Sequence, residues 1–551
     1  MEQLSGTDSY FLYTERGNNY NHVAALGIYD PSTAPGGMVR YKDILQYFSR
    51  RLDINKVFRR RLVTVPHEFD RPYWVDDADL DLEFHIRHIA LPEPGDWRQL
   101  MIQVARLHSR PLDRSRPLWE IYVVGGLDKI PGLPVGSFAL FLKFHHASVD
   151  GQAGAALLKA VHSLSPTPDD DGHPRSTIYA ERDPTSVELY TRAVAHGVVR
   201  TGSISKLYLN TLSKVAGLTI DQIARQLKPG DPGAAAAATP PGFVKAPATR
   251  FNGLVSANRV VEAVGLPLDA MQRARTRIDD ITINDLFLAI VGGALRKYLA
   301  AKEELPAKSL TALMPMSVRQ EGKPGKGGNE VGGVPVPLRT DVADPVGRLL
   351  AVRADAQAAK RGSETMGRGF LKSILDDLPN FASEAFMRYA VYPQLNVTVS
   401  NVRGPDVPLY MSGARLVHFY PVSIASDHIG LNHTGFSYNG VMWITAVACR
   451  NMMPDPAFYA ECLRGSFDEL MAAIDARPSA AHPPAPGGKP ARIHAVTAKR
   501  RRAKPVAPPP VSPRARATAK GKMKTKTKTR TQSGAKARGA PAVAKSKKRR
   551  G

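Results

Sequence analysis

Large apolar residues occupy every second position from Phe138 to Phe144, and this alternation predicts a half-buried strand. Residues 151–163 place apolar groups at three- and four-residue intervals, which predicts a helix. Between them lies the sequence His145-His146-Ala147-Ser148-Val149-Asp150. These residues are therefore predicted to form a turn from a strand into a helix, a place where a rigid sheet commonly presents catalytic side chains.

The same two periodicities predict further elements on both sides of this turn. Strands are expected at residues 21–29, 121–125, 312–319 and 395–400, with several more inside 416–447. Helices are expected at residues 41–52, 97–109, 187–227, 266–276, 345–361 and 455–474, with another that begins at Thr282. This mixture of strands and helices predicts an α/β (α+β) protein.

Composition divides the chain of 551 residues into four segments. Residues 1–162 and 250–475 each combine strand and helix patterns, and each is predicted to form one lobe. Residues 163–249 hold a helical pattern followed by a Pro-, Ala- and Gly-rich stretch, so they are predicted to be a crossover and linker. Residues 476–551 are rich in Lys, Arg, Pro and Ala and are predicted to be disordered, because they have little apolar surface to bury.

The formal net charge of +25 is concentrated in the last of these segments. Residues 481–551 contain 22 Lys and Arg and no acid, so 25 minus 22 leaves only +3 for the other 480 residues. The strongly basic character that would suggest a nucleic-acid-binding protein therefore belongs to the tail.

Cellular location is indicated by what the sequence lacks. Cys449 and Cys462 are the only cysteines and have no metal-ligand or redox spacing, so both are expected to be reduced. The first residues lack the basic and apolar regions of a signal peptide, and no run of eighteen apolar residues occurs. We expect a cytoplasmic protein with no transmembrane helix, whose membrane contact is peripheral.

The two adjacent histidines are the leading candidates for chemistry. A neutral imidazole can accept a proton from a hydroxyl group and return it to a leaving group. Asp150 follows His146 by four residues and could orient the turn, and Gly151 lets the chain bend into the helix. For the histidine pair alone, a partly buried structural turn is the favoured alternative.

The sequence His145 to Gly151 matches HHxxxDG and resembles the bacterial wax ester synthase/diacylglycerol acyltransferase family. That family is related to the wider coenzyme A-dependent acyltransferases and peptide-synthesis condensation domains. Four more segments resemble the family in the same order: Leu4 to Leu12, Pro111 to Glu120 with Pro117-Leu118-Trp119, Asn284-Asp285, and Ser400 to Pro405. The resemblance covers roughly residues 1–475, and it makes a purely structural histidine pair the weaker interpretation.

The resemblance implies a two-lobed, chloramphenicol acetyltransferase-like or condensation-domain-like fold, with central sheets flanked by helices and an active-site tunnel between the lobes. It also implies transfer of a long-chain acyl group from acyl-CoA to diacylglycerol or a long-chain alcohol. His146 is then the expected general base, with His145 and Asp150 as orienting groups. Ser148 has no Gly-x-Ser-x-Gly context, so direct transfer without an acyl-enzyme is expected.

The second lobe contributes two amides by the same resemblance. Asn284 would position the substrate or stabilise the oxyanion, although helix capping is an equal alternative for this segment. Asp285 is expected to form a capping box with Thr282 and therefore to be structural. Asn401 is carried over weakly, because Arg403 stands where the family commonly has proline.

Three further expectations complete the prediction. Pro117, Leu118 and Trp119 are expected to be structural. The basic sequence Phe58-Arg59-Arg60-Arg61 could meet coenzyme A phosphates, but a solvated surface is favoured. No metal is expected, since His418, His428 and His433 lack a defensible ligand spacing, and no cofactor is expected beyond acyl-CoA as substrate.

The basic tail suits an anionic membrane or lipid droplet. Nucleic acid would attract it as well, without sequence preference, and a merely solubilising role is the plain alternative. Two other functions stay open for the whole chain. One is a related acyltransferase or condensing enzyme for another hydroxyl acceptor, and the other is a non-catalytic lipid- or nucleic-acid-binding protein.

Overall fold

The computed structural model describes residues 1–149, 151–167, 182–197, 245–317, 331–366, 370–378 and 380–477. All of them belong to one compact unit, Met1–Ala481. The predictions made for Asp150, for most of the helical crossover and linker, and for the tail after residue 477 fall outside the described residues.

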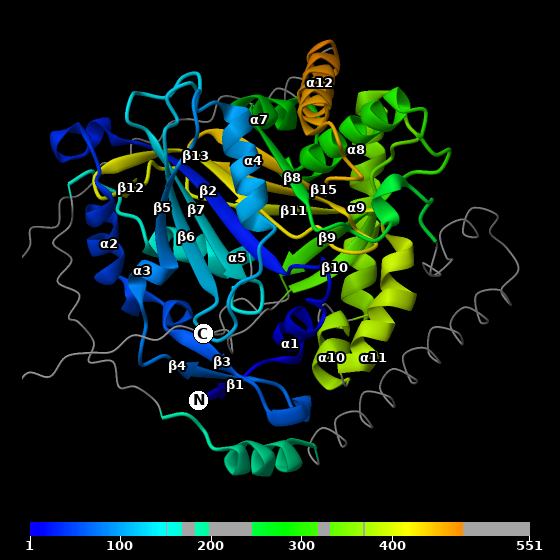
Figure 1. Ribbon diagram of the computed structural model, residues 1–551. Coiled ribbons are helices and arrows are strands. Elements are labelled where there is room, and N and C mark those ends of the chain that lie inside the picture. Colours follow the sequence, from blue (N-terminus) through cyan, green and yellow to red (C-terminus); the bar gives the residue numbers. More distant parts are fainter. Residues whose placement is uncertain are drawn as a thin grey trace, which may run out of the picture. The chain divides into compact units, whose positions relative to one another are not determined.

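The strand that precedes the histidine turn lies in a six-stranded sheet with the order β12-β13-β2-β7-β6-β5. Neighbouring strands are antiparallel except β5 and β6, which are parallel. The strands are β2 (His22–Asp30), β5 (Ile86–Ala90), β6 (Trp119–Gly125), β7 (Phe138–His145), β12 (Tyr410–Met411) and β13 (Ala414–Val422). Figure 1 shows β2, β7 and β6 side by side in blue and cyan, with the yellow β13 beyond β2. The late strands β12 and β13 therefore complete a sheet built mainly from early residues.

A second six-stranded sheet has the order β10-β9-β11-β14-β15-β8. The pairs β9–β11 and β11–β14 are parallel and the others antiparallel. Its strands are β8 (Arg259–Pro267), β9 (Thr311–Ser317), β10 (Val331–Pro337), β11 (Val397–Arg403), β14 (Leu431–Tyr438) and β15 (Val441–Cys449). A small third sheet joins β1 (Glu2–Gln3), β4 (Tyr73–Asp76) and β3 (Arg60–Val63).

Alternation along β15 explains why the second sheet is buried on both faces. Met442 and Ile444 belong to the hydrophobic core beneath the helices of the second half, whereas Trp443 and Val447 belong to the core of the first sheet. Successive strand residues point to opposite faces. The second sheet therefore lies between a helical layer and the first sheet.

Helices cover these sheets and connect them. Residues 186–197 are helical, and the other helices are α1 (Gly6–Tyr13), α2 (Tyr41–Ser49), α3 (Leu82–His85), α4 (Trp97–His108), α5 (Gly151–Ala160), α7 (Leu268–Arg277), α8 (Ile283–Ala301), α9 (Pro345–Met366), α10 (Phe370–Asp377), α11 (Asn380–Phe386) and α12 (Pro456–Asp475). In the second half α8, α9 and α12 pack together, and α4 contacts both β2 and β8 (Figure 1). None of the described helices combines the length and apolarity that a membrane crossing requires.

Several predicted boundaries are wrong. The helix expected at residues 41–52 ends at Ser49, and the one expected at 345–361 continues to Met366. The helix expected to begin at Leu266 begins at Leu268, because β8 continues to Pro267 before the chain turns. The strand expected to end at Ser400 continues to Arg403, because its last residues pair in parallel with β14. Asn401 and Arg403 therefore lie within a strand, not in the turn after it.

Candidate active site

The turn after β7 is organised around His145, which is fully buried. The backbone N–H of Ser148 donates to the His145 carbonyl oxygen over 2.9 Å, and the Ser148 hydroxyl donates to the same oxygen over 2.7 Å. The backbone N–H of Ala147 donates to His145 Nδ1 over 3.1 Å. Three donors from the next residues thus fold the chain back onto this histidine, and the Ser148 hydroxyl is engaged in the turn.

His146 is half-buried and lies face to face with Phe11 of α1. The two ring centroids are 4.1 Å apart and the ring planes differ by 13°. The backbone N–H of His146 donates to the carbonyl oxygen of Asn21 over 2.8 Å. Stacking and the backbone bond together restrict how the imidazole of the expected base can move, and Gly151 begins α5 directly after the turn.

Glu15 is a functional candidate that the sequence analysis missed. Its Oε2 accepts the Nε2–H of His145 over 2.8 Å, and only 7% of its side chain is exposed. Burial raises the pKa of this carboxyl group, but the hydrogen bond from His145, the backbone N–H of Asn21 and the nearby Arg114 outweigh burial and lower it. Glu15 is therefore a carboxylate that contacts the histidine turn.

The segment Pro117-Leu118-Trp119 lies against the same turn. The Leu118 carbonyl oxygen accepts the backbone N–H of His145 over 3.0 Å, and the Pro117 carbonyl oxygen accepts that of Trp119 over 2.8 Å. The Trp119 indole is fully buried and donates to the carbonyl oxygen of Phe58 over 3.0 Å. The structure thus places this segment as a support beneath the histidines.

A buried ion pair joins β6 to β7 just before the turn. Lys143 Nζ lies 3.1 Å from Glu120 Oε2, with 0% and 9% of the two side chains exposed. Burial lowers the pKa of Lys143, although the Glu120 carboxylate acts in the opposite direction. Neither residue was expected to matter from the sequence, because a buried lysine in an apolar strand has no local signal.

The two candidate amides of the second half lie together. Asn284, in the first turn of α8, donates from Nδ2 to the sulfur of Met314 over 3.3 Å. Asn401 of β11 donates from Nδ2 to Asn284 Oδ1 over 3.5 Å. Because α5 packs against β11, the helix that follows the histidine turn contacts the strand that carries Asn401.

Asp285 forms the capping box that the sequence predicts, which confirms that expectation. Its Oδ2 accepts the backbone N–H of Thr282 over 2.9 Å and the Thr282 hydroxyl over 2.7 Å. Thr282 Oγ1 in turn accepts the backbone N–H of Asp285 over 3.2 Å. Since Asp285 is committed to the helix end, Asn284 is the member of this pair that is available for chemistry.

Gly404 follows β11 at a place where only glycine fits. Its N–H donates to the Ser437 carbonyl oxygen over 3.0 Å, and a Cβ atom here would collide with Phe436 and with the Ser437 backbone. The neighbouring Arg403 is exposed and pairs with Asp406 at 3.1 Å. The positive charge of Arg403, which stands where the family commonly has proline, is thus paired with a neighbouring carboxylate.

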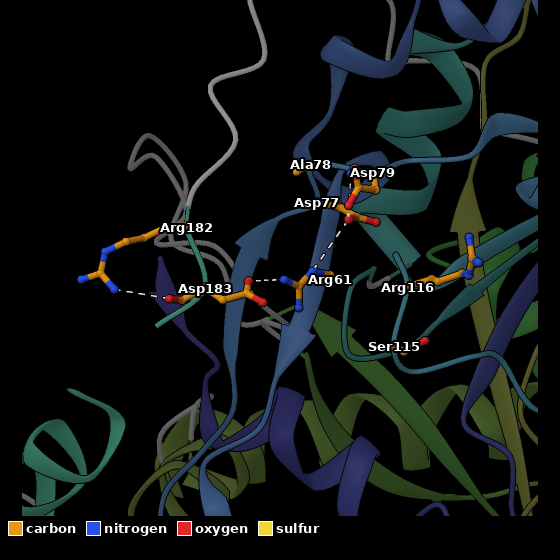
Figure 2. Close-up of a pocket in the computed structure, with 8 residues that line it drawn as sticks. All are labelled: Arg61, Asp77, Ala78, Asp79, Ser115, Arg116, Arg182 and Asp183. Atoms are coloured by element: carbon orange, nitrogen blue, oxygen red, sulfur yellow. Dashed lines mark hydrogen bonds and ion pairs between the residues drawn. The ribbon is translucent and has the colours of Figure 1, made fainter. Parts of the chain in front are cut away.

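The basic segment Arg59 to Arg61 is distributed among carboxylates. Arg59 lies 3.1 Å from Asp53, and Arg60 lies 2.8 Å from Glu2. Figure 2 shows Arg61 between Asp77 and Asp183, in a surface pocket of about 700 Å³. The pocket is lined by three arginines and three aspartates, Arg61, Arg116, Arg182, Asp77, Asp79 and Asp183, with Ala78 and Ser115. This balance favours the solvated-surface interpretation over a phosphate site.

The histidines of the late strands are separate from one another. His433 Nε2 lies 2.6 Å from the Tyr459 hydroxyl in the core. The His418 ring is tilted by 42° against the Trp443 ring, with the ring centroids 4.7 Å apart. Over the described ranges, no group of three or more His, Cys, Asp and Glu side chains is arranged to hold a metal ion. Cys449 and Cys462 are both buried and free.

Comparison with known proteins covers most of the chain. Residues 4–287 match the family model described as the wax ester synthase/diacylglycerol acyltransferase catalytic domain, and residues 327–471 match the WS/DGAT C-terminal domain. A putative diacylglycerol O-acyltransferase of Mycobacterium tuberculosis is 34% identical over 504 residues, covering 86% of this chain and 97% of the relative. A probable diacylglycerol O-acyltransferase of the same species is 31% identical and covers 86% of this chain and 100% of the relative.

Solved structures agree with the sequence comparison. A wax ester synthase/diacylglycerol acyltransferase from Marinobacter aquaeolei VT8 is 26% identical, with a TM-score of 0.60 over 86% of this chain and 100% of that one. The first condensation domain of the calcium-dependent antibiotic synthetase is 14% identical, with a TM-score of 0.51 over 87% of this chain and 97% of that one. The second likeness concerns the fold alone and agrees with the condensation-domain-like fold expected from the sequence.

Proposed function

The chain belongs to the wax ester synthase/diacylglycerol acyltransferase family, and from that premise we propose that it transfers a long-chain acyl group from acyl-CoA to a lipid hydroxyl. With diacylglycerol as acceptor the product is triacylglycerol, and with a long-chain alcohol it is a wax ester. The observation that carries the proposal is the match to both family domains, with His145 and His146 of the family motif at the strand end.

His146 is the general base of the proposed reaction. Its imidazole takes the proton from the acceptor hydroxyl while the oxygen forms a bond to the thioester carbonyl carbon. Collapse of the tetrahedral intermediate breaks the carbon–sulfur bond, and the proton then passes from the imidazole to the coenzyme A thiolate. A positioned base of this kind contributes about 10²- to 10⁴-fold to the rate.

The intermediate carries a negative oxygen that needs a hydrogen-bond donor. Asn284 is our proposed donor, because its amide lies at the start of α8, where the helix N-terminus also favours negative charge. Its Nδ2 now faces only the weakly accepting sulfur of Met314 at 3.3 Å, so little hydrogen-bond energy opposes a change of partner. Asn401, 3.5 Å from Asn284 Oδ1, would hold that amide in orientation.

Direct transfer between the two substrates requires no covalent intermediate on the protein. The Ser148 hydroxyl, which lies within the motif, donates to the His145 carbonyl oxygen, and this bond supports a structural role for it. Acyl-CoA enters the proposal as a substrate, and the chemistry calls for no further cofactor.

Peripheral contact with a membrane or lipid droplet belongs to the same proposal. Both proposed acceptors dissolve in lipid, and the basic residues after position 481 supply 22 positive charges that an anionic surface attracts. Non-specific attraction to nucleic acid would follow from the same charges. A cytoplasmic location belongs to the same proposal, because Cys449 and Cys462 are both free thiols.

The test compares the wild-type protein with His146→Ala, using radiolabelled palmitoyl-CoA with diacylglycerol or hexadecanol. We expect neutral lipid and free thiol from the wild type, and a rate lower by at least about 10²-fold in the variant. His88→Ala, which changes an exposed histidine on β5, is the matched control and should keep wild-type turnover. A folded wild-type protein that acylates neither acceptor would refute the proposed function.

A further inference from the structure

One carboxylate oxygen, Glu15 Oε2, accepts hydrogen bonds from two segments that meet at the histidine turn. It accepts the Nε2–H of His145 over 2.8 Å and the backbone N–H of Asn21 over 3.1 Å. Glu15 follows α1 by two residues in the chain, and His145 lies 130 positions away. The contact is therefore specific to the folded protein.

The neighbours of His145 determine which of its ring nitrogens carries the proton. The backbone N–H of Ala147 points at Nδ1 over 3.1 Å, and a backbone amide can only donate, so Nδ1 is an acceptor and carries no proton. The neutral ring then has its proton on Nε2, where the Glu15 carboxylate accepts it.

A second path runs from Glu15 to His146 through the backbone. The N–H of Asn21 donates to Glu15 Oε2, and the carbonyl oxygen of the same residue accepts the backbone N–H of His146 over 2.8 Å. The Asn21 side chain also donates to the carbonyl oxygen of Phe11, over 2.5 Å, and Phe11 stacks on His146. Both histidines and the stacked ring are thus connected to one buried carboxylate.

The surrounding charges keep Glu15 ionised for this role. Arg114 lies 3.5 Å from its Oε1, and His22 lies 3.7 Å from its Oε2. Burial, followed by the charge of Lys143, lowers the pKa of His22 well below its ordinary value, so His22 is neutral and does not compete for the carboxylate as a cation. A charged acceptor makes a stronger hydrogen bond to an imidazole than a neutral one.

We propose that Glu15 is a positioning residue of the acyl-transfer reaction, holding the His145 ring and the Asn21 backbone so that His146 faces the acceptor hydroxyl. The role of Glu15 in catalysis rests on the proposed function, whereas its bond to His145 can be tested without any substrate. Glu15 acts through its neighbours and is not expected to touch substrate itself.

Glu15→Gln is the main test because it keeps the shape of the side chain and removes its charge. We expect kcat to fall by about 10²-fold, which is the cost of misplacing a catalytic group by about 1 Å. The KM for palmitoyl-CoA should change little, because the interaction is needed only in the transition state. Glu15→Asp, which keeps the charge on a shorter side chain, should recover part of kcat. Glu2→Gln is the control, since Glu2 is half-exposed and pairs with Arg60 on the small sheet, and it should leave kcat unchanged.

The second readout is proton NMR of histidine-labelled protein without substrate. A proton shared between His145 Nε2 and a buried carboxylate should give a downfield, exchange-protected signal in the wild type and in Glu2→Gln, and this signal should vanish in Glu15→Gln. If Glu15→Gln keeps wild-type kcat, or if the wild type lacks the signal, the proposal is overturned. A wild type that shows the signal but transfers no acyl group would instead refute the proposed function and retain the structural bond.

Discussion

Replacing Lys143 by methionine removes one half of the buried ion pair that precedes the histidine turn. The Lys143 ammonium lies 3.1 Å from Glu120 and donates to the carbonyl oxygens of Leu107 and Arg110 over 3.2 and 3.0 Å. Its three N–H groups therefore each have an acceptor. Methionine keeps most of the length and the apolar stem, so the change isolates the charge.

The expected loss follows from what remains around Glu120. Leaving one member of a buried pair without its partner costs about 3–5 kcal/mol. Glu120 retains the hydrogen bond from the Tyr122 hydroxyl over 2.9 Å, and the Arg87 guanidinium lies 3.5 Å from it. Because these two groups offset part of the penalty, we expect the lower end of the range, about 3 kcal/mol.

Urea unfolding followed by circular dichroism measures this loss. The double variant Lys143→Met/Glu120→Leu should recover much of it, since no charge is then left buried without its partner. Lys159→Met on the exposed side of α5 is the control, expected within about 0.5 kcal/mol of wild type. A loss below about 1 kcal/mol for Lys143→Met, or a double variant as unstable as the sum of the single ones, would refute the reasoning.

Two other perturbations test groups near and far from the turn. Phe11→Ala removes the ring stacked on His146 and should lower kcat by about 2- to 10-fold, the equivalent of about 0.5–1.5 kcal/mol for an aromatic pair. Phe11→Tyr keeps a ring and should have a kcat near that of the wild type. Equal turnover by the two variants in the acyl-transfer assay would contradict this prediction. Burial lowers the pKa of His433 to about 3, so below about pH 6.5 the unfolded chain binds a proton that the folded chain excludes, and stability falls as the pH falls toward 3. The urea concentration at the unfolding midpoint should therefore fall less in His433→Gln than in the wild type when the pH is lowered from about 7 to about 5. An equal fall in the two proteins would count against a neutral, buried His433.

Local periodicity was enough to predict the elements around the chemistry. The alternating residues before the histidines were predicted to form a strand and form β7, and the residues after them were predicted to form a helix and form α5. The capping box of Thr282 was also predictable, because both partners lie within one helical turn. These features depend on interactions between residues close in the chain, which a sequence displays directly.

Pairing between distant strands could not be predicted in the same way. The alternating residues 416–447 were expected to belong to the second lobe, yet β13 pairs with β2, where Leu416 lies opposite Tyr29. Alternation shows that a segment is a strand with one buried face, but it carries no information about which edge the strand joins. The division into lobes at residues 162 and 250 remains a proposal about sequence segments.

Glu15 was missed for a related reason. A single acid after a short helix has no spacing that points to His145, 130 residues later. The N-terminal segment that resembles the family ends at Leu12, and Tyr13 and Thr14 separate it from Glu15. An acid whose partners lie in other segments is visible only once the chain is folded.

Helix α1 also sets an order of events during synthesis. Phe11 stacks on His146, while the neighbouring Tyr10 hydroxyl lies 2.6 Å from that of Tyr392, 382 positions later in the chain. A ribosome adding about 5–20 residues per second needs about 20–80 s to cover that interval. Throughout this time the edge of β2 that later pairs with β13 has no partner. The contact between α1 and Tyr392 therefore forms only after most of the described unit has been synthesised.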